Sequence, residues 1–426
     1  MIDMKLAYKK PSIILFIFVW FLSIFCYFFL SLLETLGAKS LGISRFDSFF
    51  FMCVCVFLMF IGLYYDNTCR LRSSMIKKLD QYSIDNANII NLLCVFGLIA
   101  GVATFVEGGG FTGDLQAQRE LYISGEFREV GLLSYISQFG NSLGLIGISL
   151  ITWTSQKNLI KMSFALLCIF GALLQSLVTG GRIAVLIFCL PLIISLFVKH
   201  QRLIFLKYKL KFLIGAIVLG TLFVSAMSAW VYFREFSRLE FLFGRLENLS
   251  LLLDSLGIQL NSNTNLFLTY GIHRTFSSFA DGIFHFSPFF EVYKPHPLLG
   301  GYQFNFIAMR FPNADWSAWK DEIEYSYRHF GMFWNVWGTF VREFIVDFGY
   351  VGALIASYLS GMFICRLEVR CLRSPLLLSL YILSLVWLVM SIFYSALVIR
   401  YFHIAIIILI IGEMFNLLFS KPKNLT

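Results

Sequence analysis

The chain is dominated by apolar runs of about 20 residues that carry almost no charge. A run of this length crosses the roughly 30 Å hydrocarbon core of a bilayer as a helix, because each helical residue adds about 1.5 Å. Only 14% of the 426 residues are charged and 58% are apolar, whereas about 25% of residues are charged in an ordinary soluble domain. The sequence therefore excludes a soluble enzyme, a disordered chain and a coiled coil. It predicts an all-α polytopic integral membrane protein whose surroundings are a lipid bilayer.

We predict about ten transmembrane helices from these runs. The expected ranges are 11–33, 47–65, 88–106, 131–153, 162–179, 183–198, 212–232, 345–365, 375–396 and 401–419. The first run is long enough to span, and no small-residue cleavage site follows it, so we expect a span rather than a signal peptide. The three parts are therefore 1–232 with seven spans and an outer loop at 107–130, 233–344 as one large outer loop, and 345–426 with three spans and a cytoplasmic tail.

The distribution of Lys and Arg predicts the orientation. With the N-terminus in the cytoplasm, the inner segments hold 19 of the 34 basic residues and only five acids. None of the nine cysteines then falls on an outer loop, which fits a compartment that oxidises thiols. We expect both termini to be cytoplasmic. The net charge of +9 reflects this topology, and we expect no nucleic acid partner.

The basic residues differ in kind across the membrane. The outer 15 are 12 Arg and three Lys, whereas the inner 19 are mostly Lys. The planar guanidinium group grips phosphate with two parallel hydrogen bonds, so an outer face rich in Arg indicates a phosphate or pyrophosphate ligand. The alternative is that these residues pair with outer acids and with lipid phosphates.

Arg182 is the sharpest of these candidates. It follows Thr179-Gly-Gly in a turn too short to be a loop, between two predicted spans. A charge at membrane depth is expensive unless it faces a cavity or a partner, and the glycines allow close backbone approach. The alternative is that Arg182 lies at the end of a span and that its guanidinium group extends to the membrane–water interface.

Three further arginines lie on one side of a predicted amphipathic helix in the large loop. Arg234, Arg238 and Arg245 fall within about 40° of one another at about 100° per residue, with apolar residues opposite. The helix is expected to rest at the outer membrane–water interface. Its arginines then face either a cavity that holds lipid-linked pyrophosphate or ordinary lipid head groups. The remaining candidates for substrate binding are Arg119, Arg128, Arg274, Arg310 and Arg328.

A general base is harder to assign. His273 and His296 lie in the large loop, and histidine titrates near neutrality. Asp281, Glu291 and Glu324 are alternatives, and no spacing pairs a histidine with a carboxylate. The many aromatic residues of this loop can stack on sugar rings or form an interfacial belt. No Cys-based zinc site is visible in the sequence, and we expect no metal and no cofactor.

Several short motifs carry a family resemblance. They are the Gly-Gly-Arg turn at 180–182, the run Leu298-Leu-Gly-Gly-Tyr-Gln-Phe, the pair Phe311-Pro312, and Asp347-Phe-Gly-Tyr-Val-Gly before a span. With ten or more spans and one large loop late in the chain, they resemble the Wzy-type O-antigen polymerases, also called oligosaccharide repeat unit polymerases.

The resemblance implies a metal-independent glycosyltransferase of GT-C type in the bacterial inner membrane, with the large loop in the periplasm. Such proteins join undecaprenyl-pyrophosphate-linked oligosaccharide units into surface polysaccharide. Arg182 matches the family's functional arginine best, and a chain-length regulator is an implied partner. The alternatives are an O-antigen ligase, which transfers glycan to lipid A-core, and a polysaccharide flippase or other transporter.

Overall fold

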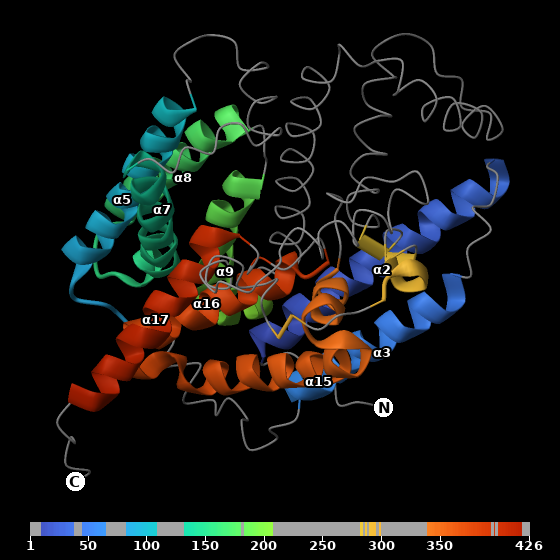
Figure 1. The fold of residues 1–426 in the computed structure, drawn as a ribbon. Coiled ribbons are helices and arrows are strands. Elements are labelled where there is room, and N and C mark those ends of the chain that lie inside the picture. Colours follow the sequence, from blue (N-terminus) through green and yellow to red (C-terminus); the bar gives the residue numbers. More distant parts are fainter. Residues whose placement is uncertain are drawn as a thin grey trace.

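The structure is a computed structural model that describes residues 10–37, 45–64, 82–108, 132–179, 183–207, 282–283, 286–287, 289–294, 298–299, 339–392, 396 and 399–419. Every long element in these ranges is an α-helix, as the sequence predicts (Figure 1). The helices are α2 (Pro11–Gly37), α3 (Arg45–Tyr64), α5 (Ala87–Glu107), α7 (Leu132–Leu150), α8 (Asn158–Thr179), α9 (Ile183–Lys207), α15 (Phe340–Arg370), α16 (Pro375–Met390) and α17 (Arg400–Phe419). Two 3-10 turns, η2 (Ile151–Trp153) and η4 (Cys371–Arg373), follow α7 and α15.

These helices make the protein a multi-pass membrane protein. Within the described ranges, six helices are long and apolar enough to cross a bilayer, and Ala184–His200 and Pro375–Met390 are shorter apolar helices. Helices occupy nine of the ten predicted ranges, while 212–232 lies outside the part that the structure describes.

The helices form two packed groups joined by a central helix. In Figure 1, α5, α7 and α8 lie together on the left, and α3 lies along α15 at the lower right. Both groups use glycine to bring backbones together, as membrane helices often do. A Cβ atom on Gly101 of α5 would lie 2.1 Å from the carbonyl oxygen of Gly171 of α8, and one on Gly62 of α3 would lie 2.3 Å from the carbonyl oxygen of Tyr358 of α15.

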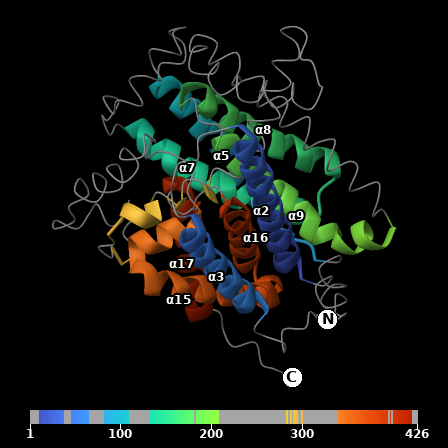
Figure 2. The ribbon, with the colours of Figure 1, turned by 90° about the vertical axis from the view of Figure 1, so that its right-hand side faces the viewer.

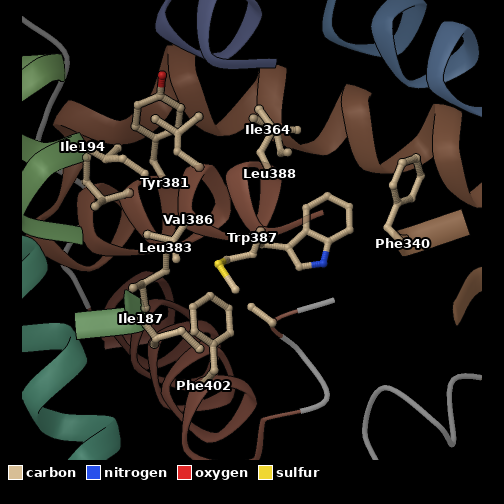
Figure 3. Close-up of a cluster of buried hydrophobic side chains, with 14 of the residues drawn as sticks. Ile187, Ile194, Phe340, Ile364, Tyr381, Leu383, Val386, Trp387, Leu388 and Phe402 are labelled. Atoms are coloured by element: carbon tan, nitrogen blue, oxygen red, sulfur yellow. The ribbon is translucent and has the colours of Figure 1, made fainter. Parts of the chain in front are cut away.

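The central helix is α16, whose residues 378–388 are all buried. It contacts α2, α7, α9, α15 and α17, and Figure 2 shows α2 lying beside it. A helix buried on all sides must be largely apolar on all sides, which explains the apolar character of this run. Its buried hydroxyl groups, on Ser379, Tyr381 and Ser384, are hydrogen-bonded. Figure 3 shows buried side chains of α16 together with side chains of α9, α15 and α17. The labelled residues are Ile187, Ile194, Phe340, Ile364, Tyr381, Leu383, Val386, Trp387, Leu388 and Phe402.

At the predicted cytoplasmic end, α2, α15 and α16 meet around a buried carboxylate. Glu368 of α15 accepts a hydrogen bond from Ser12 Oγ at 2.8 Å and another from the Tyr381 hydroxyl at 2.9 Å. Each carboxylate oxygen therefore has a donor, which burial of this group requires. Ser12 and Glu368 lie at helix ends that the charge distribution assigns to the same side, and Tyr381 lies in the half of α16 that begins on that side.

A second polar cluster joins α7, α9 and α16 at that end. Trp153 Nε1 donates to Ser195 Oγ at 2.6 Å, and the hydroxyls of Ser149 and Ser379 lie 2.6 Å apart. Lys199 lies over the Trp153 ring, 5.4 Å from its centroid. These contacts join ends that the sequence places on one side of the membrane.

Candidate functional site

Helix α15 is interrupted near its predicted outer end. Gly349 has φ 70° and ψ 179°, which is not a helical conformation. Only glycine adopts this region without strain. The change of direction ends the regular i to i−4 hydrogen bonding, so α15 consists of an outer half-helix, 340–348, and an inner half-helix, 350–370.

Two residues of the large loop cap the outer half-helix at the break. The backbone amides of Leu298 and Leu299 donate to the carbonyl oxygens of Val346 and Asp347, over 3.3 and 2.7 Å. The last carbonyls of a helix have no partner within it and need one elsewhere. Leu299 reaches this position with φ 49°, an uncommon value for a residue with a side chain. The structure thus brings together two segments on which the family resemblance rests.

Tyr350, the first residue after the break, binds the same loop from the other side. Its hydroxyl lies 3.1 Å from the carbonyl oxygen of Phe290 and 3.0 Å from that of Tyr293, and it donates to them. Its ring meets Phe290 edge to face at 5.2 Å and Phe51 of α3 at 5.7 Å. Residues 289–294 are therefore clamped between the break and α3.

Charged side chains are buried in the outer half-helix. Arg342 is 6% exposed, while Glu343 and Asp347 are fully buried. Arg342 Nη2 lies 3.4 Å from Glu343 Oε1. Burial of charge is costly unless it is paired, and ionisable residues at membrane depth usually mark functional sites. The carboxylates can accept a proton from a hydroxyl group.

None of these three residues is among the site residues predicted from the sequence. The predicted span begins at 345, which places Arg342 and Glu343 at the end of the loop, whereas α15 begins at Phe340. Asp347 entered only as the first residue of a motif. The sequence feature that could have pointed to them is the presence of three charged residues within six positions at the start of an apolar run.

The residues predicted from sequence to form the site lie outside the described part of the chain. They are Arg119, Arg128, Arg182, Arg234, Arg238, Arg245, His273, Arg274, His296, Arg310 and Arg328. Asp281 and Glu324 also lie outside it, and Glu291 is exposed on the segment that Tyr350 binds. Helix α8 ends at Thr179 and α9 begins at Ile183, so three residues connect them, in agreement with the predicted short turn.

No group of three or more His, Cys, Asp or Glu side chains in the described ranges is placed to hold a metal ion. Comparison of the chain with protein-family models, with curated proteins and with solved structures finds no match.

Proposed function

We propose that this protein polymerises oligosaccharide repeat units carried on undecaprenyl pyrophosphate, on the periplasmic face of the bacterial inner membrane. In this proposal the body is a ten-span, GT-C-like bundle with both termini in the cytoplasm. The observation that carries it is the set of buried charges beside the break in α15, where the motif segments beginning at Leu298 and Asp347 are hydrogen-bonded.

The reaction breaks the bond between the anomeric carbon of the growing chain and its pyrophosphate oxygen. A hydroxyl of the next lipid-linked unit forms the new glycosidic bond and gives its proton to a base. The departing pyrophosphate gains negative charge, which positioned guanidinium groups stabilise. A catalyst of this kind needs arginine near the phosphates and a base near the acceptor.

Arg182 is assigned to the leaving pyrophosphate in this proposal. His273 and His296 are candidate bases, and Asp347 joins them because its buried carboxyl lies beside the break. Substrate binding is assigned to the other outer arginines, namely Arg119, Arg128, Arg234, Arg238, Arg245, Arg274, Arg310 and Arg328.

The test is an Arg182 series in a strain that makes the polymer. We expect Arg182→Ala to abolish long chains and Arg182→Lys to be poor, because an ammonium group lacks the planar fork. Arg202→Ala, at the predicted inner end of α9, is the matched control and should leave chain length unchanged. The readout is the polysaccharide ladder on a gel, with membrane protein levels measured in parallel.

The same gel separates the close alternatives. Loss of a polymerase leaves one repeat unit on the lipid core, whereas loss of an O-antigen ligase leaves none. Normal long chains in Arg182→Ala at normal protein level would remove Arg182 from the mechanism.

One observation favours a second candidate, a transporter of the same lipid-linked glycan. Interrupted helices with nearby charged residues are typical of secondary transporters, and α15 is such a helix. Purified protein in vesicles distinguishes the two, because a transporter moves the lipid-linked unit across the bilayer without lengthening it.

A further inference from the structure

The outer part of α7 is polar on the side that faces the protein. Ser137, Asn141 and Ser142 are buried there. Its other side is apolar and exposed, through Leu132, Leu133, Tyr135, Ile136 and Phe139. Polar groups turned inward within a membrane bundle are expensive to keep and are often associated with a ligand or ion path.

Hydrogen bonds connect this side of α7 to its neighbours in a continuous row. Asn141 Nδ2 donates to Gln175 Oε1 of α8 at 3.2 Å and to Ser137 Oγ at 3.4 Å. The Ser137 hydroxyl lies 2.5 Å from Thr104 Oγ1 of α5. We call Thr104, Ser137, Asn141 and Gln175 the α7 polar row.

The α7 polar row lies at the level where the neighbouring helices end. Thr104 is three residues from the end of α5 and Gln175 is four residues from the end of α8, or roughly 5–6 Å at 1.5 Å per residue. Both ends are on the predicted outer side. The row is therefore close to the predicted outer ends of α5 and α8, and Gln175 precedes Arg182 by seven residues.

One acceptor of the row has no donor among the residues that the structure describes. Asn141 is fully buried, and its Oδ1 atom makes no hydrogen bond within the described ranges. An unsatisfied buried acceptor costs about 1–3 kcal/mol. A hydroxyl group at this position would satisfy Asn141 Oδ1, and it can come from a sugar or from a buried water.

We infer that the α7 polar row is a sugar subsite, which binds hydroxyls of the glycan next to the pyrophosphate. This inference rests on the proposed function. Amide and hydroxyl side chains suit sugar hydroxyls, because each partner both donates and accepts hydrogen bonds. Asn141 holds Gln175 in place through its Nδ2 bond and supplies the acceptor that lacks a donor.

The experiment compares two probes bound to the full-length protein in nanodiscs. One is the undecaprenyl-pyrophosphate-linked repeat unit extracted from a strain that lacks the protein, and the other is undecaprenyl pyrophosphate without sugar. Asn141→Leu and Gln175→Leu should raise the Kd of the sugar-bearing probe about tenfold, the effect of losing one hydrogen bond to a buried group. The Kd of the sugar-free probe should not change.

Ser379→Ala is the matched control, because it removes a buried hydroxyl contact at the opposite end of α7, and it should alter neither Kd. Equal weakening of both probes, or no weakening by either variant, would overturn the sugar subsite and leave a structural row that holds water. Failure of the wild-type protein to bind either probe would instead overturn the proposed function. Gln175 is only partly buried, so Gln175→Leu keeps the test valid if Asn141→Leu fails to fold.

Discussion

The backbone amide of Leu299 donates a hydrogen bond to the carbonyl oxygen of Asp347 over 2.7 Å. This bond ties the large loop to the point at which α15 is interrupted. The conformation of Gly349 therefore depends on a segment about 50 residues earlier in the chain, because the carbonyls released by the break accept hydrogen bonds from Leu298 and Leu299 rather than from the next turn of the helix.

The break itself can be tested by Gly349→Ala. Its φ of 70° with ψ of 179° is strained for any residue with a Cβ atom, and we expect a loss of roughly 1–3 kcal/mol in the free energy of unfolding. Denaturant unfolding in detergent measures it. Gly412→Ala in α17 is the control, because its Cβ would meet only the side chain of Leu376, at 3.1 Å and beyond. Equal stability of the two variants would contradict the break.

The hydrogen bonds of the buried Glu368 carboxylate, at the predicted inner end of the bundle, are expected to contribute to stability. Tyr381→Phe removes the donor to Glu368 Oε1 and should destabilise the protein by about 1–3 kcal/mol. Tyr135→Phe on the exposed side of α7 removes the same atom and should have little effect. A double-mutant cycle with Ser12→Ala then measures the coupling between the two donors. No difference between Tyr381→Phe and Tyr135→Phe would show that the Tyr381 bond is not formed.

The packing of the large loop on α3 is open to cross-linking. Ser48 Oγ lies 2.9 Å from Ser287 Oγ, so cysteines at both positions are close enough for a disulfide. Mild oxidation of Ser48→Cys/Ser287→Cys should give a linked peptide that mass spectrometry identifies among the native cysteines. The pair Ser12→Cys/Ser287→Cys, with Ser12 at the opposite end of the bundle, should give none. A disulfide in the Ser12/Ser287 pair but not in the Ser48/Ser287 pair would show that residue 287 does not pack on α3.

Because α5 and α8 lie so close together, we expect that adding a methyl group at their contact destabilises the protein. A Cβ atom on Gly101 would lie 2.1 Å from the Gly171 carbonyl oxygen, so Gly101→Ala must push the helices apart. We expect a loss of about 1–3 kcal/mol, typical of overpacking. Val102→Leu, one residue further on and exposed, also adds one carbon and should be tolerated. Thermal unfolding in detergent compares the two, and equal melting temperatures would mean that the helices lie further apart.

The positions of the helices could be predicted because the hydrocarbon core demands long apolar runs. Their ends could not. Helix α9 continues to Lys207, beyond the predicted end at 198, because backbone hydrogen bonding persists after the chain has become charged. Helix α15 begins at Phe340 rather than 345, because the Arg342–Glu343 pair allows charge to be buried.

The break in α15 illustrates why the site was harder to predict than the fold. Gly349 and Gly361 lie in the same helix and look alike in the sequence. Gly361 is a packing residue, since a Cβ atom there would lie 2.2 Å from the Met59 carbonyl oxygen of α3. At Gly349 the helix changes direction, and the hydrogen bonds from Leu298 and Leu299 stabilise this break. The roles of Arg182 and of the other outer arginines remain predictions.

The central position of α16 has a consequence for biogenesis. This helix follows α2, α7, α9 and α15 in the sequence, yet all four pack on it, as does α17. The earlier helices must therefore wait in the bilayer, and the bundle closes only when α16 has been inserted. A nascent chain truncated before Pro375 would expose the inward faces of α2 and α9 to membrane proteases.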